Sequence, residues 1–446
     1  MIGNVMRLVY NVLFALFFAV SLPYYFVRIW RRGNWRSGLG ERFGWYGAEL
    51  REHLRGRRVI WFHAVSVGEA NLCVPLVRAF GESLSGWTIV VSTTTTTGMT
   101  ELQRKLPAEV YKVYYPVDFL PFVNRALRVI HPDVMVLVEA EIWPNMLWRL
   151  ADEGTACCLV NARLSDRSAR RYAQFSGLFE AIFAQFAGVG VQNQGDADRL
   201  KQVGCRPDRV VVTGNLKFDA VGLTSRHSID PATILRWAGA PTDAVVLLGS
   251  STHAGEEQVL GKIYSRLRER LKKVYLVVVP RHFERGREVA KQLLELGLRP
   301  WLRSEYAEDS SPLPGGDCLV VDSTGELRFF YDVADVVFVG KSLRTRGGQN
   351  PIEPAAAGCA VVMGPHMENF RPIVKSFLAA DSMLQVRDDI ELHETLGRLL
   401  QDADERQGLG RRAREVVDAN RGAIDRSVAM IRPFLIEAAR TKGSAV

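Results

Sequence analysis

Short, strongly apolar runs recur along the chain from residue 58 to residue 365, and segments of helix length separate them. Most of these runs are rich in valine and isoleucine and are apolar throughout. In the first half they are "RVIWFHAV", "TIVVSTTT", "VYKVYYPV", "DVMVLVEA", "TACCLVNA", "GVGVQNQ" and "VVVTGN", and in the second half they are "AVVLLGSS", "KVYLVVVP", "DCLVVDST", "VVFVGKS" and "CAVVMGP". Strands that are apolar on both faces are typical of parallel sheets that helices cover on both sides. The alternation therefore predicts an α/β fold built from doubly wound, Rossmann-like sheets.

The length of the chain predicts two such domains. A single hydrophobic core rarely extends beyond about 250–300 residues, and this chain has 446. A polar stretch at residues 221–235 interrupts the alternation and is the predicted linker. We therefore expect one domain at residues 37–220 and a second at residues 236–446, with the last helix free to return to the first domain. Ligands of such sheets bind at the carboxyl ends of the strands, here in a cleft that the two domains face.

The N-terminus differs from the rest of the chain. The segment Leu8–Val27 carries no charge and has about the 20 residues that a bilayer core requires. The positive-inside rule places the rest of the chain in the cytoplasm because four arginines follow: Arg28, Arg31, Arg32 and Arg36. A cleaved signal peptide is disfavoured because no small-residue cleavage site follows. Residues 1–36 are thus predicted to be a membrane anchor, either a single-pass helix or, given Pro23, an interfacial one.

Charge and cysteine content narrow the class of protein. The net charge of +8 comes from 57 basic and 49 acidic residues, which suits nucleic acid, a membrane surface or an anionic substrate. No signature of RNA or DNA binding is present, so nucleic acid ranks last among these partners. The six cysteines form no CxxC pair, and the absence of a disulfide framework favours a reducing compartment.

Polar side chains gather directly after the apolar runs. In the first half they include Glu69 in "HAVSVGE", Glu139 in "VEAEIWPN" and Lys217 in "GNLKFD". Other polar residues accompany them: His63, Ser66, Glu141 and Asp219. In the second half "SSTHAGEE", "VPRHFERG", "DSTGEL" and "GGQNPIEP" follow four of the runs. Charged residues at strand ends are usually solvated, but their repetition at one predicted edge indicates a binding site.

Several kinds of site lack support. The eight histidines show no HExxH motif, and the pairs Asp196–Asp198 and Asp402–Asp404 are interpreted as helix-start or solvated acids. We therefore expect no metal. No GxxxxGK[ST] or GxGxxG loop is present, so neither an NTPase nor a dinucleotide enzyme is indicated. Ser66 in "VSVGE" does not match the GxSxG elbow of hydrolases.

The stretch "GGQNPIEPAAAGCAVVMGP" predicts a phosphate and ribose site. A helix is expected from Pro351 to Gly358 and a strand at Cys359–Met363. The loop Gly347–Asn350 would then offer free backbone N–H groups to an anion. Glu353 would accept two hydrogen bonds from a ribose diol. An ordinary glycine turn before an alanine helix is the alternative interpretation.

Two further segments of the second half are candidates for nucleotide contacts. Arg281 in "PRH" offers a forked donor to a phosphate or carboxylate. The loop Thr324–Glu326 offers backbone groups that could read a base. A surface salt bridge for Arg281 and helix capping for Glu326 remain the structural alternatives.

These segments together resemble the Kdo (3-deoxy-D-manno-octulosonic acid) transferases. The likeness rests on seven of them, in the order of the family: "HAVSVGE", "VEAEIWPN", "NARLSDRS", "GNLKFD", "SSTHAGEE", "VPRHFERG" and "GGQNPIEP…MGPHMENF". It covers nearly the whole chain, including the N-terminal segment and "GERFG" at Gly40–Gly44. Gln349 is a departure, since many relatives carry histidine there, and we do not expect it to change the chemistry.

The resemblance implies a GT-B glycosyltransferase fold, inversion at the transferred sugar, and neither metal nor other cofactor. It also implies CMP-Kdo as the donor and the lipid A precursor as the acceptor, at the cytoplasmic face of the inner membrane in lipopolysaccharide biosynthesis. By family position Glu69 is the general base, and Glu139 and Lys217 stabilise the transition state. The implied CMP contacts are Pro280, Arg281, Thr324, Gly325, Glu326, Asn350, Pro351, Ile352 and Glu353.

Two other functions remain as alternatives. A related GT-B enzyme at the membrane would use a UDP-sugar and a lipid-linked acceptor. A membrane-tethered nucleotide-sugar binding protein would bind without turnover, although an intact Glu69 argues against it. Glu41 in "GERFG" is the rival candidate for the base, but it lies nearer the anchor and is expected outside the layer of strand ends.

Overall fold

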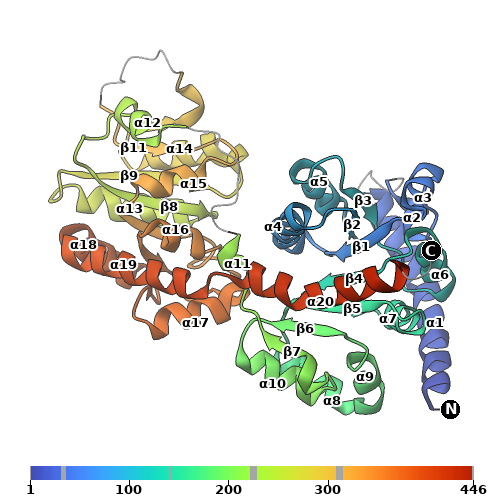
Figure 1. The fold of residues 1–446 in the computed structure, drawn as a ribbon. Helices are drawn as coiled ribbons and strands as arrows, with labels where there is room; N and C mark the ends of the chain where they lie inside the picture. Colours follow the sequence, from blue (N-terminus) through green and yellow to red (C-terminus); the bar gives the residue numbers. More distant parts are fainter. Residues whose placement is uncertain (1, 32–36, 140–141, 221–228, 308–314, 444–446) are drawn as a thin grey trace. The chain divides into compact units, whose positions relative to one another are not determined.

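The chain forms two compact units, which Figure 1 shows as ribbons. A computed structural model describes residues 2–31, 37–139, 142–220, 229–307 and 315–443. Unit 1 consists of Met1–Leu223 together with Arg421–Val446, and unit 2 consists of Thr224–Asn420. Each unit is built around its own sheet of seven parallel strands, which confirms the predicted α/β fold with two doubly wound sheets.

The sheet of unit 1 has the strand order β3-β2-β1-β4-β5-β6-β7. Its strands are β1 (Arg58–His63), β2 (Trp87–Thr93), β3 (Tyr111–Tyr114), β4 (Val134–Val138), β5 (Ala156–Ala162), β6 (Gly188–Val191) and β7 (Val210–Val212). All seven lie in runs from which strands were predicted. The order reverses between β1 and β4, and ligands of doubly wound sheets bind at such a switch point.

Helices cover both faces of this sheet. In β1, Val59 and Trp61 point into one core, while Ile60 and Phe62 point into the other. This burial on both sides explains why the strands read as continuous apolar runs. The helices of unit 1 are α1 (Ile2–Arg31), α2 (Leu39–Arg42), α3 (Ala48–Leu54), α4 (Val67–Ser83), α5 (Thr96–Lys105), α6 (Leu120–Ile130), α7 (Pro144–Asp152), α8 (Asp166–Gln174), α9 (Ser176–Phe183), α10 (Gln194–Gln202), α11 (Leu216–Asp219) and α20 (Ala423–Gly443).

The last helix, α20, packs on unit 1 and contacts α4, α11 and strands β4 to β6 (Figure 1). Asp219 fixes its start, because the carboxylate accepts hydrogen bonds from Gly422 N at 2.7 Å and from Ile424 N at 2.6 Å. An aspartate cap of this kind typically contributes about 0.5–2 kcal/mol. Asp219 therefore holds the start of α20 on unit 1, a contact that the sequence did not predict.

The sheet of unit 2 has the strand order β10-β11-β9-β8-β12-β13-β14, and it reverses between β8 and β12. Its strands are β8 (Val245–Thr252), β9 (Val274–Pro280), β10 (Pro300–Leu302), β11 (Cys318–Val320), β12 (Val336–Val339), β13 (Ala360–Met363) and β14 (Leu384–Gln385). Five of them lie in predicted runs. The two edge strands, β10 and β14, were not predicted.

The helices of unit 2 surround this sheet. They are α12 (Pro231–Trp237), α13 (Glu256–Leu267), α14 (Gly286–Glu295), α15 (Leu327–Phe330), α16 (Ile352–Ala357), α17 (Arg371–Ala379), α18 (Asp389–Gln401) and α19 (Ala403–Asn420). Asp230 caps α12, so the last residues of the predicted linker are helical. Its first residues, 221–228, lie outside the described residues.

Helix α1 docks on unit 1 through polar contacts with the region of α7. Tyr10 Oη donates to Asp118 Oδ2 at 2.8 Å, and Arg7 forms an ion pair with Asp152 at 2.8 Å. The amides of Asn11 and Asn145 hydrogen-bond each other at 3.0 Å. One face of the helix is thus held by specific partners, which an apolar sequence pattern alone does not predict.

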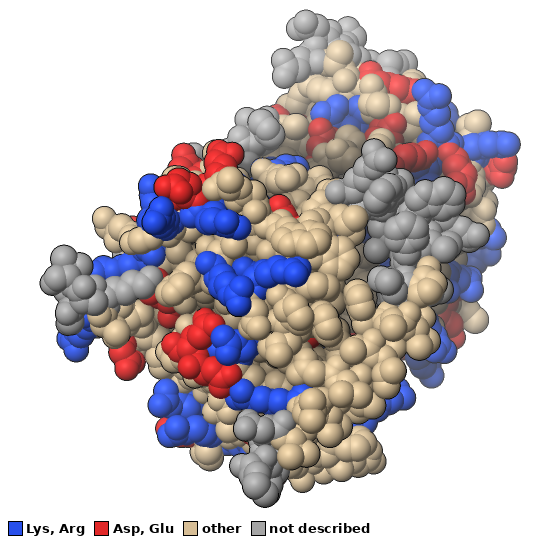
Figure 2. All heavy atoms as spheres, turned by 90° about the vertical axis from the view of Figure 1, so that its right-hand side faces the viewer, with Lys and Arg blue, Asp and Glu red and all other residues tan. Residues whose placement is uncertain are grey.

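The opposite side of α1 is apolar and exposed. Its exposed large side chains are Val5, Leu8, Val9, Val12, Leu13, Leu16, Phe17 and Val20. Figure 2 views the side on which α1 lies in Figure 1, and a broad area there carries few charged side chains. Within the described residues, no helix combines the length and the hydropathy that crossing a bilayer requires. The predicted flanking arginines, Arg28, Arg31, Arg32 and Arg36, lie outside the described side chains.

Candidate functional site

Glu69 lies beside the switch point of unit 1, in the first turn of α4 directly after β1. Ser66 caps this helix. The Glu69 carboxylate accepts a hydrogen bond from Val65 N at 2.7 Å and one from Ser66 Oγ at 3.2 Å. These contacts hold the carboxylate over the start of its own helix, next to the edge where a ligand would bind.

His63, which the sequence placed among the polar residues of this edge, lies in the core instead. Its side chain is fully buried and stacks on Tyr115 with ring centroids 3.7 Å apart. Burial lowers the pKa of His63 to about 3, so the imidazole is neutral at physiological pH. Nδ1 lies 3.2 Å from the carbonyl oxygen of Ser92. His63 is therefore a structural residue.

Glu139 and Lys217 lie close together on the other side of the switch point. Glu139 follows β4 in a left-handed conformation with φ of 65°, which is strained for a residue other than glycine. Burial lowers the pKa of Lys217, while the charge of Glu139 acts in the opposite direction and that of Arg163 lowers it further. The Arg163 Nε lies 3.8 Å from Glu139 Oε2. Glu141, the neighbouring acid, lies outside the described residues.

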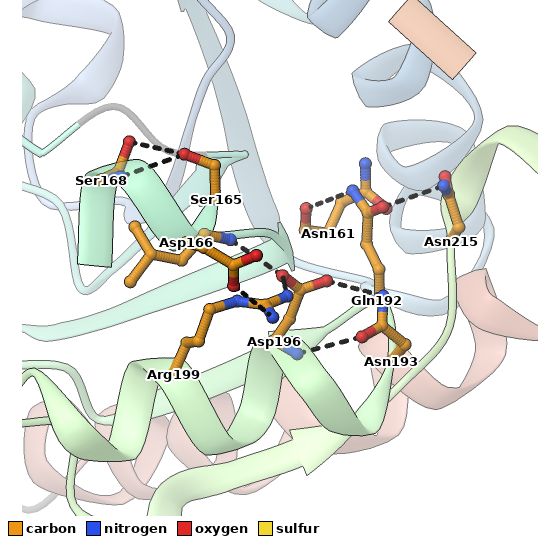
Figure 3. Close-up of polar contacts among 10 residues, drawn as sticks. Asn161, Ser165, Asp166, Ser168, Gln192, Asn193, Asp196, Arg199 and Asn215 are labelled. Atoms are coloured by element: carbon orange, nitrogen blue, oxygen red, sulfur yellow. Dashed lines mark hydrogen bonds and ion pairs between the residues drawn. The ribbon is translucent and has the colours of Figure 1, made fainter. Parts of the chain in front are cut away.

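A network of hydrogen bonds extends along this edge. The residue at its centre is Asn161, which the sequence analysis did not identify. Asn161, near the end of β5, contacts Glu139 and the backbone of Leu216. It also contacts Gln192, as Figure 3 shows. Farther along, Asp196 accepts from Leu164 N and binds Arg199 at 2.7 Å, so it supports the chain rather than a ligand. The segment "NARLSDRS" was the available signal, but it identified no individual residue.

Glu41 also reaches the edge of strand ends, contrary to the expectation that it lies outside. Its Oε2 accepts a hydrogen bond from the backbone N of Tyr114, the last residue of β3, at 2.7 Å. Burial raises the pKa of the Glu41 carboxyl group, and the bond from Tyr114 partly offsets the rise. Arg42 stacks on the Tyr114 ring with its guanidinium 4.3 Å from the centroid. Glu41 thus attaches α2 to the sheet.

In unit 2, a buried carboxylate organises the switch point between β8 and β12. Glu256 is fully buried at the start of α13. Its Oε2 accepts from His253 N at 2.9 Å and from Lys341 N at 2.8 Å. Its Oε1 accepts from Ser342 N and from Leu343 N, both at 3.0 Å. One side chain therefore joins the segments that follow the two strands.

Cationic groups surround this point. Burial lowers the pKa of His253; the charge of Glu256 acts in the opposite direction, and the neighbouring Lys341, His282 and Arg281 lower the pKa further. The rings of His253 and His282 lie 6.0 Å apart, and Gln349 Nε2 lies 3.2 Å from His253 Nε2. Arg281 and His282 are exposed. The structure thus collects positive charge at the carboxyl ends of β8, β9 and β12, where an anionic ligand would be stabilised.

Two N–H groups of the loop Gly347–Asn350 are not free, contrary to the prediction. Gly347 N donates to Glu368 Oε2 at 2.7 Å, and Gly348 N donates to the carbonyl oxygen of Lys341 at 2.9 Å. The helix that follows, α16, has only six residues. The sequence predicted that this loop would bind an anion through free N–H groups at the start of the helix. For Gly347 and Gly348 that prediction is wrong, because their N–H groups already donate to residues distant in sequence.

Asn350 and Glu353 nevertheless lie where the sequence placed them. Asn350 Oδ1 accepts from Ile352 N at 3.1 Å, and its Nδ2 donates to Glu353 Oε1 at 3.1 Å. Pro351 is the residue before α16, and Gly358 ends the helix in a left-handed conformation with φ of 84°. The asparagine thus orients the glutamate at the end of the β12–β13 connection.

The loop Thr324–Glu326 follows β11, next to β9 with its terminal Pro280 and the following Arg281. Thr324 and Gly325 are exposed, and Gly325 has φ of 80°. Glu326 forms an ion pair with Arg303 at 2.9 Å. Its carboxylate makes no capping bond to α15, so the capping alternative is not supported.

Acidic clusters contribute no metal site within the described ranges. No group of three or more histidine, cysteine, aspartate or glutamate side chains there could hold a metal ion. Asp402 accepts from Glu405 N at 2.9 Å and so stabilises the start of α19. The six cysteines are buried and free.

Comparisons with known proteins identify relatives that match at least 90% of the chain. A family model described as 3-deoxy-D-manno-octulosonic-acid transferase (kdotransferase) matches residues 37–220. The 3-deoxy-D-manno-octulosonic acid transferase of Haemophilus influenzae is 31% identical over 407 residues, which are 90% of this chain and 92% of that protein. The transferase of Bordetella pertussis is 33% identical over 427 residues, 93% of this chain and 96% of its own.

Among solved structures, the UDP-GlcNAc 2-epimerase from Neisseria meningitidis has a similar fold. It aligns with 85% of this chain and 100% of its own, with a TM-score of 0.56 and 12% identity. At this identity the likeness shows the fold alone, which is the GT-B-like pair of doubly wound domains.

Proposed function

This chain belongs to the 3-deoxy-D-manno-octulosonic acid transferase family, and we propose that it transfers Kdo from CMP-Kdo to the lipid A precursor in lipopolysaccharide biosynthesis. The observation that carries the proposal is the likeness to two transferases at 31% and 33% identity over at least 90% of this chain. The carboxyl edges of the two sheets support the proposal. The edge in unit 1 carries carboxylates and a lysine, and the edge in unit 2 carries cationic side chains.

In the proposed reaction an acceptor hydroxyl attacks the anomeric carbon of Kdo. A new C–O bond forms there, and the bond from that carbon to the phosphate oxygen of CMP breaks, so CMP leaves with the bonding electrons. Attack opposite the leaving group inverts the anomeric centre. Glu69 would take the hydroxyl proton, because a carboxylate fixed beside the switch point can reach a bound acceptor.

Glu139 and Lys217 would stabilise the charges that develop during this step. Positive charge grows on the sugar ring in an oxocarbenium-like transition state, and negative charge grows on the departing phosphate. A fixed carboxylate favours the first charge and an ammonium group the second. The charge coupling between Glu139 and Lys217 supports this pairing of roles.

The cationic edge of unit 2 would hold the donor. CMP-Kdo carries a phosphate and a sugar carboxylate, and positive charge at the ends of β8, β9 and β12 suits both. The proposed nucleotide contacts remain those that the family motif implies: Pro280, Arg281, Thr324, Gly325, Glu326, Asn350, Pro351, Ile352 and Glu353. Within this set Glu353, oriented by Asn350, would bind the ribose diol.

We also propose that the protein is held at the cytoplasmic face of the inner membrane. The exposed apolar side of α1 supports this, because such a surface binds readily to a lipid interface. The full chain should sediment with membranes, and a chain that begins at Trp35 should stay soluble and keep its affinity for CMP. Recovery of the full chain entirely in the soluble fraction would refute the membrane proposal.

The reaction is tested directly by incubating the full-length protein with CMP-Kdo and the lipid A precursor. Mass analysis should show the lipid product gaining Kdo while CMP is released. A parallel incubation replaces CMP-Kdo with UDP-N-acetylglucosamine. Transfer from the UDP-sugar without transfer from CMP-Kdo would show that the enzyme is a different membrane glycosyltransferase, and binding of CMP-Kdo without any transfer would show a binding protein.

The role of the base is tested by Glu69→Gln, which keeps the size of the side chain but cannot take the proton. Turnover should fall by about 10²–10⁴-fold, the usual scale of general-base catalysis, while CMP affinity stays unchanged. The matched variant is Glu41→Gln, at the other carboxylate of the same edge. Near-normal turnover in Glu69→Gln, with folded but inactive Glu41→Gln, would assign the base to Glu41.

A further inference from the structure

Asn161 occupies the place where three segments of unit 1 meet. It is fully buried near the end of β5, with φ of 54°. Asparagine tolerates this left-handed conformation better than most residues, although it is still uncommon there. A buried polar side chain in a strained backbone, at the edge where ligands of this fold bind, calls for a functional explanation.

Its contacts connect the two residues proposed to stabilise the transition state. Nδ2 donates to Glu139 Oε1 at 3.3 Å, and Oδ1 accepts from the backbone N of Leu216 at 3.0 Å. Leu216 is the first residue of α11 and directly precedes Lys217. Figure 3 shows Asn161 facing Gln192, whose Nε2 donates to its carbonyl oxygen at 3.0 Å. One amide thus contacts the Glu139 carboxylate and the helix start that carries Lys217.

The partners determine the orientation of the amide. The N–H of Leu216 can only donate, so the Asn161 oxygen must face it, and the nitrogen then faces the carboxylate of Glu139. An uncharged side chain that donates and accepts at once meets both requirements. An ionised aspartate could accept from Leu216 N but could not donate to Glu139, and an apolar residue could do neither.

The surrounding charges make the position of Glu139 sensitive to this amide. Arg163 Nε lies 3.8 Å away on one side, and Lys217 is coupled to Glu139 by charge. Long cationic side chains alone do not fix a carboxylate, because Arg163 is half exposed and its reach is flexible. The buried amide of Asn161 provides the rigid contact.

We propose that Asn161 is a positioning residue for the transfer reaction, which holds the Glu139 carboxylate and the start of α11 with Lys217 in their working arrangement. This inference rests on the proposed function. It assigns Asn161 no contact with the substrate, and it predicts that the effect of Asn161 on turnover passes through Glu139.

The informative variant is Asn161→Asp, which keeps the acceptor for Leu216 N and tolerates the left-handed backbone. At pH 8 the introduced carboxylate repels Glu139, and we expect turnover at saturating substrates to fall at least tenfold. At lower pH the introduced group becomes protonated and can donate to Glu139, so activity should recover with the uptake of one proton. CMP affinity should not change, because the proposed CMP contacts all belong to unit 2.

The matched control is Asn193→Asp, at the residue that directly follows Gln192 (Figure 3). Asn193 also donates to a carboxylate, Asp196 Oδ2 at 2.7 Å, and also accepts from a backbone N–H, that of Asp196 at 3.0 Å. It has no hydrogen bond to Glu139 or to α11 among the contacts described here. Activity within about twofold of the unmodified protein, with an unchanged pH profile, is expected.

A double-mutant cycle decides whether Asn161 acts through Glu139. If it does, adding Asn161→Asp to Glu139→Gln should reduce turnover no further than Glu139→Gln alone. The inference would be overturned if the two substitutions reduced turnover independently, so that their effects multiplied in the double variant. It would also be overturned if the pH profile of Asn161→Asp showed no new titration, or if Glu139→Gln kept full activity. None of these results would contradict Kdo transfer itself. If the unmodified protein fails to transfer Kdo, the proposed function and this inference both fall. Thermal unfolding and CMP binding at both pH values show that each variant is folded.

Discussion

Glu256→Gln is the substitution for which the structure gives the most definite expectation. The wild-type carboxylate accepts four backbone N–H groups, two on each oxygen, from His253 and from the segment Lys341–Leu343. Glutamine retains one acceptor oxygen and places an NH₂ group against the other two donors. Both donors on that side are buried or partly buried, so they lose their partner without gaining water.

The magnitude follows from the number of bonds. Each charge-assisted hydrogen bond is worth about 1.5–3 kcal/mol, so the loss of two costs about 3–6 kcal/mol. Because about 1.4 kcal/mol corresponds to a factor of ten, local opening should become about 10²–10⁴-fold more frequent. Affinity for CMP should also decrease, since Lys341 belongs to the cationic edge.

Hydrogen exchange followed by mass spectrometry measures this opening at the amides of residues 341–343. The matched control is Glu288→Gln, which removes a carboxylate that is 54% exposed and paired with Arg285 at 3.3 Å. An exposed pair contributes about 0–1 kcal/mol, so the control should leave exchange at residues 341–343 unchanged. Unchanged protection of these amides in Glu256→Gln would refute the reasoning that Glu256 holds the two segments together.

Two other perturbations test separate parts of the molecule. Burial raises the pKa of Asp118 to about 7, so the folded state keeps a proton that the unfolded state releases, and stability should decrease as pH rises from about 4 to 7. Asp118→Asn should flatten this dependence in urea unfolding, and an unchanged slope would exclude Asp118 as its source. Glu353→Ala should weaken CMP binding by a few kcal/mol at most, from two lost charge-assisted bonds, without unfolding the protein. An unchanged dissociation constant in calorimetry would exclude Glu353 as a contact of the ribose.

The strands show how far local pattern determined the fold. Every strand that forms the interior of the two sheets was predicted, because a strand buried on both faces must be apolar at successive positions, as in β1 and β8. The strands β10 and β14, at the two edges of one sheet, have three and two residues. Unlike the equally short β7 and β11, neither of these strands belongs to a longer apolar run, so pairing with a neighbour defines them and the sequence does not.

The candidate site divides in the same way. The sequence located Glu69, Glu139 and Lys217, because polar residues that closely follow apolar strands lie at the carboxyl edge of a parallel sheet. It located Glu353 in the segment of loop and helix that joins two such strands. The sequence could not show which polar groups already have hydrogen-bond partners within the protein. The N–H of Gly347 binds Glu368, and Glu256 binds residues 85 to 87 positions away.

By itself, then, the sequence determined the class of fold, the positions of the inner strands along the chain and the edge at which chemistry would occur, since these depend on the local succession of apolar and polar residues. Only the tertiary structure decided that His63 is a core residue, that Asp219 caps α20 and that Asn161 joins Glu139 to α11. The physical reason is that burial and hydrogen bonding satisfy each polar group through whichever partner folding brings near, and those partners lie far away along the chain.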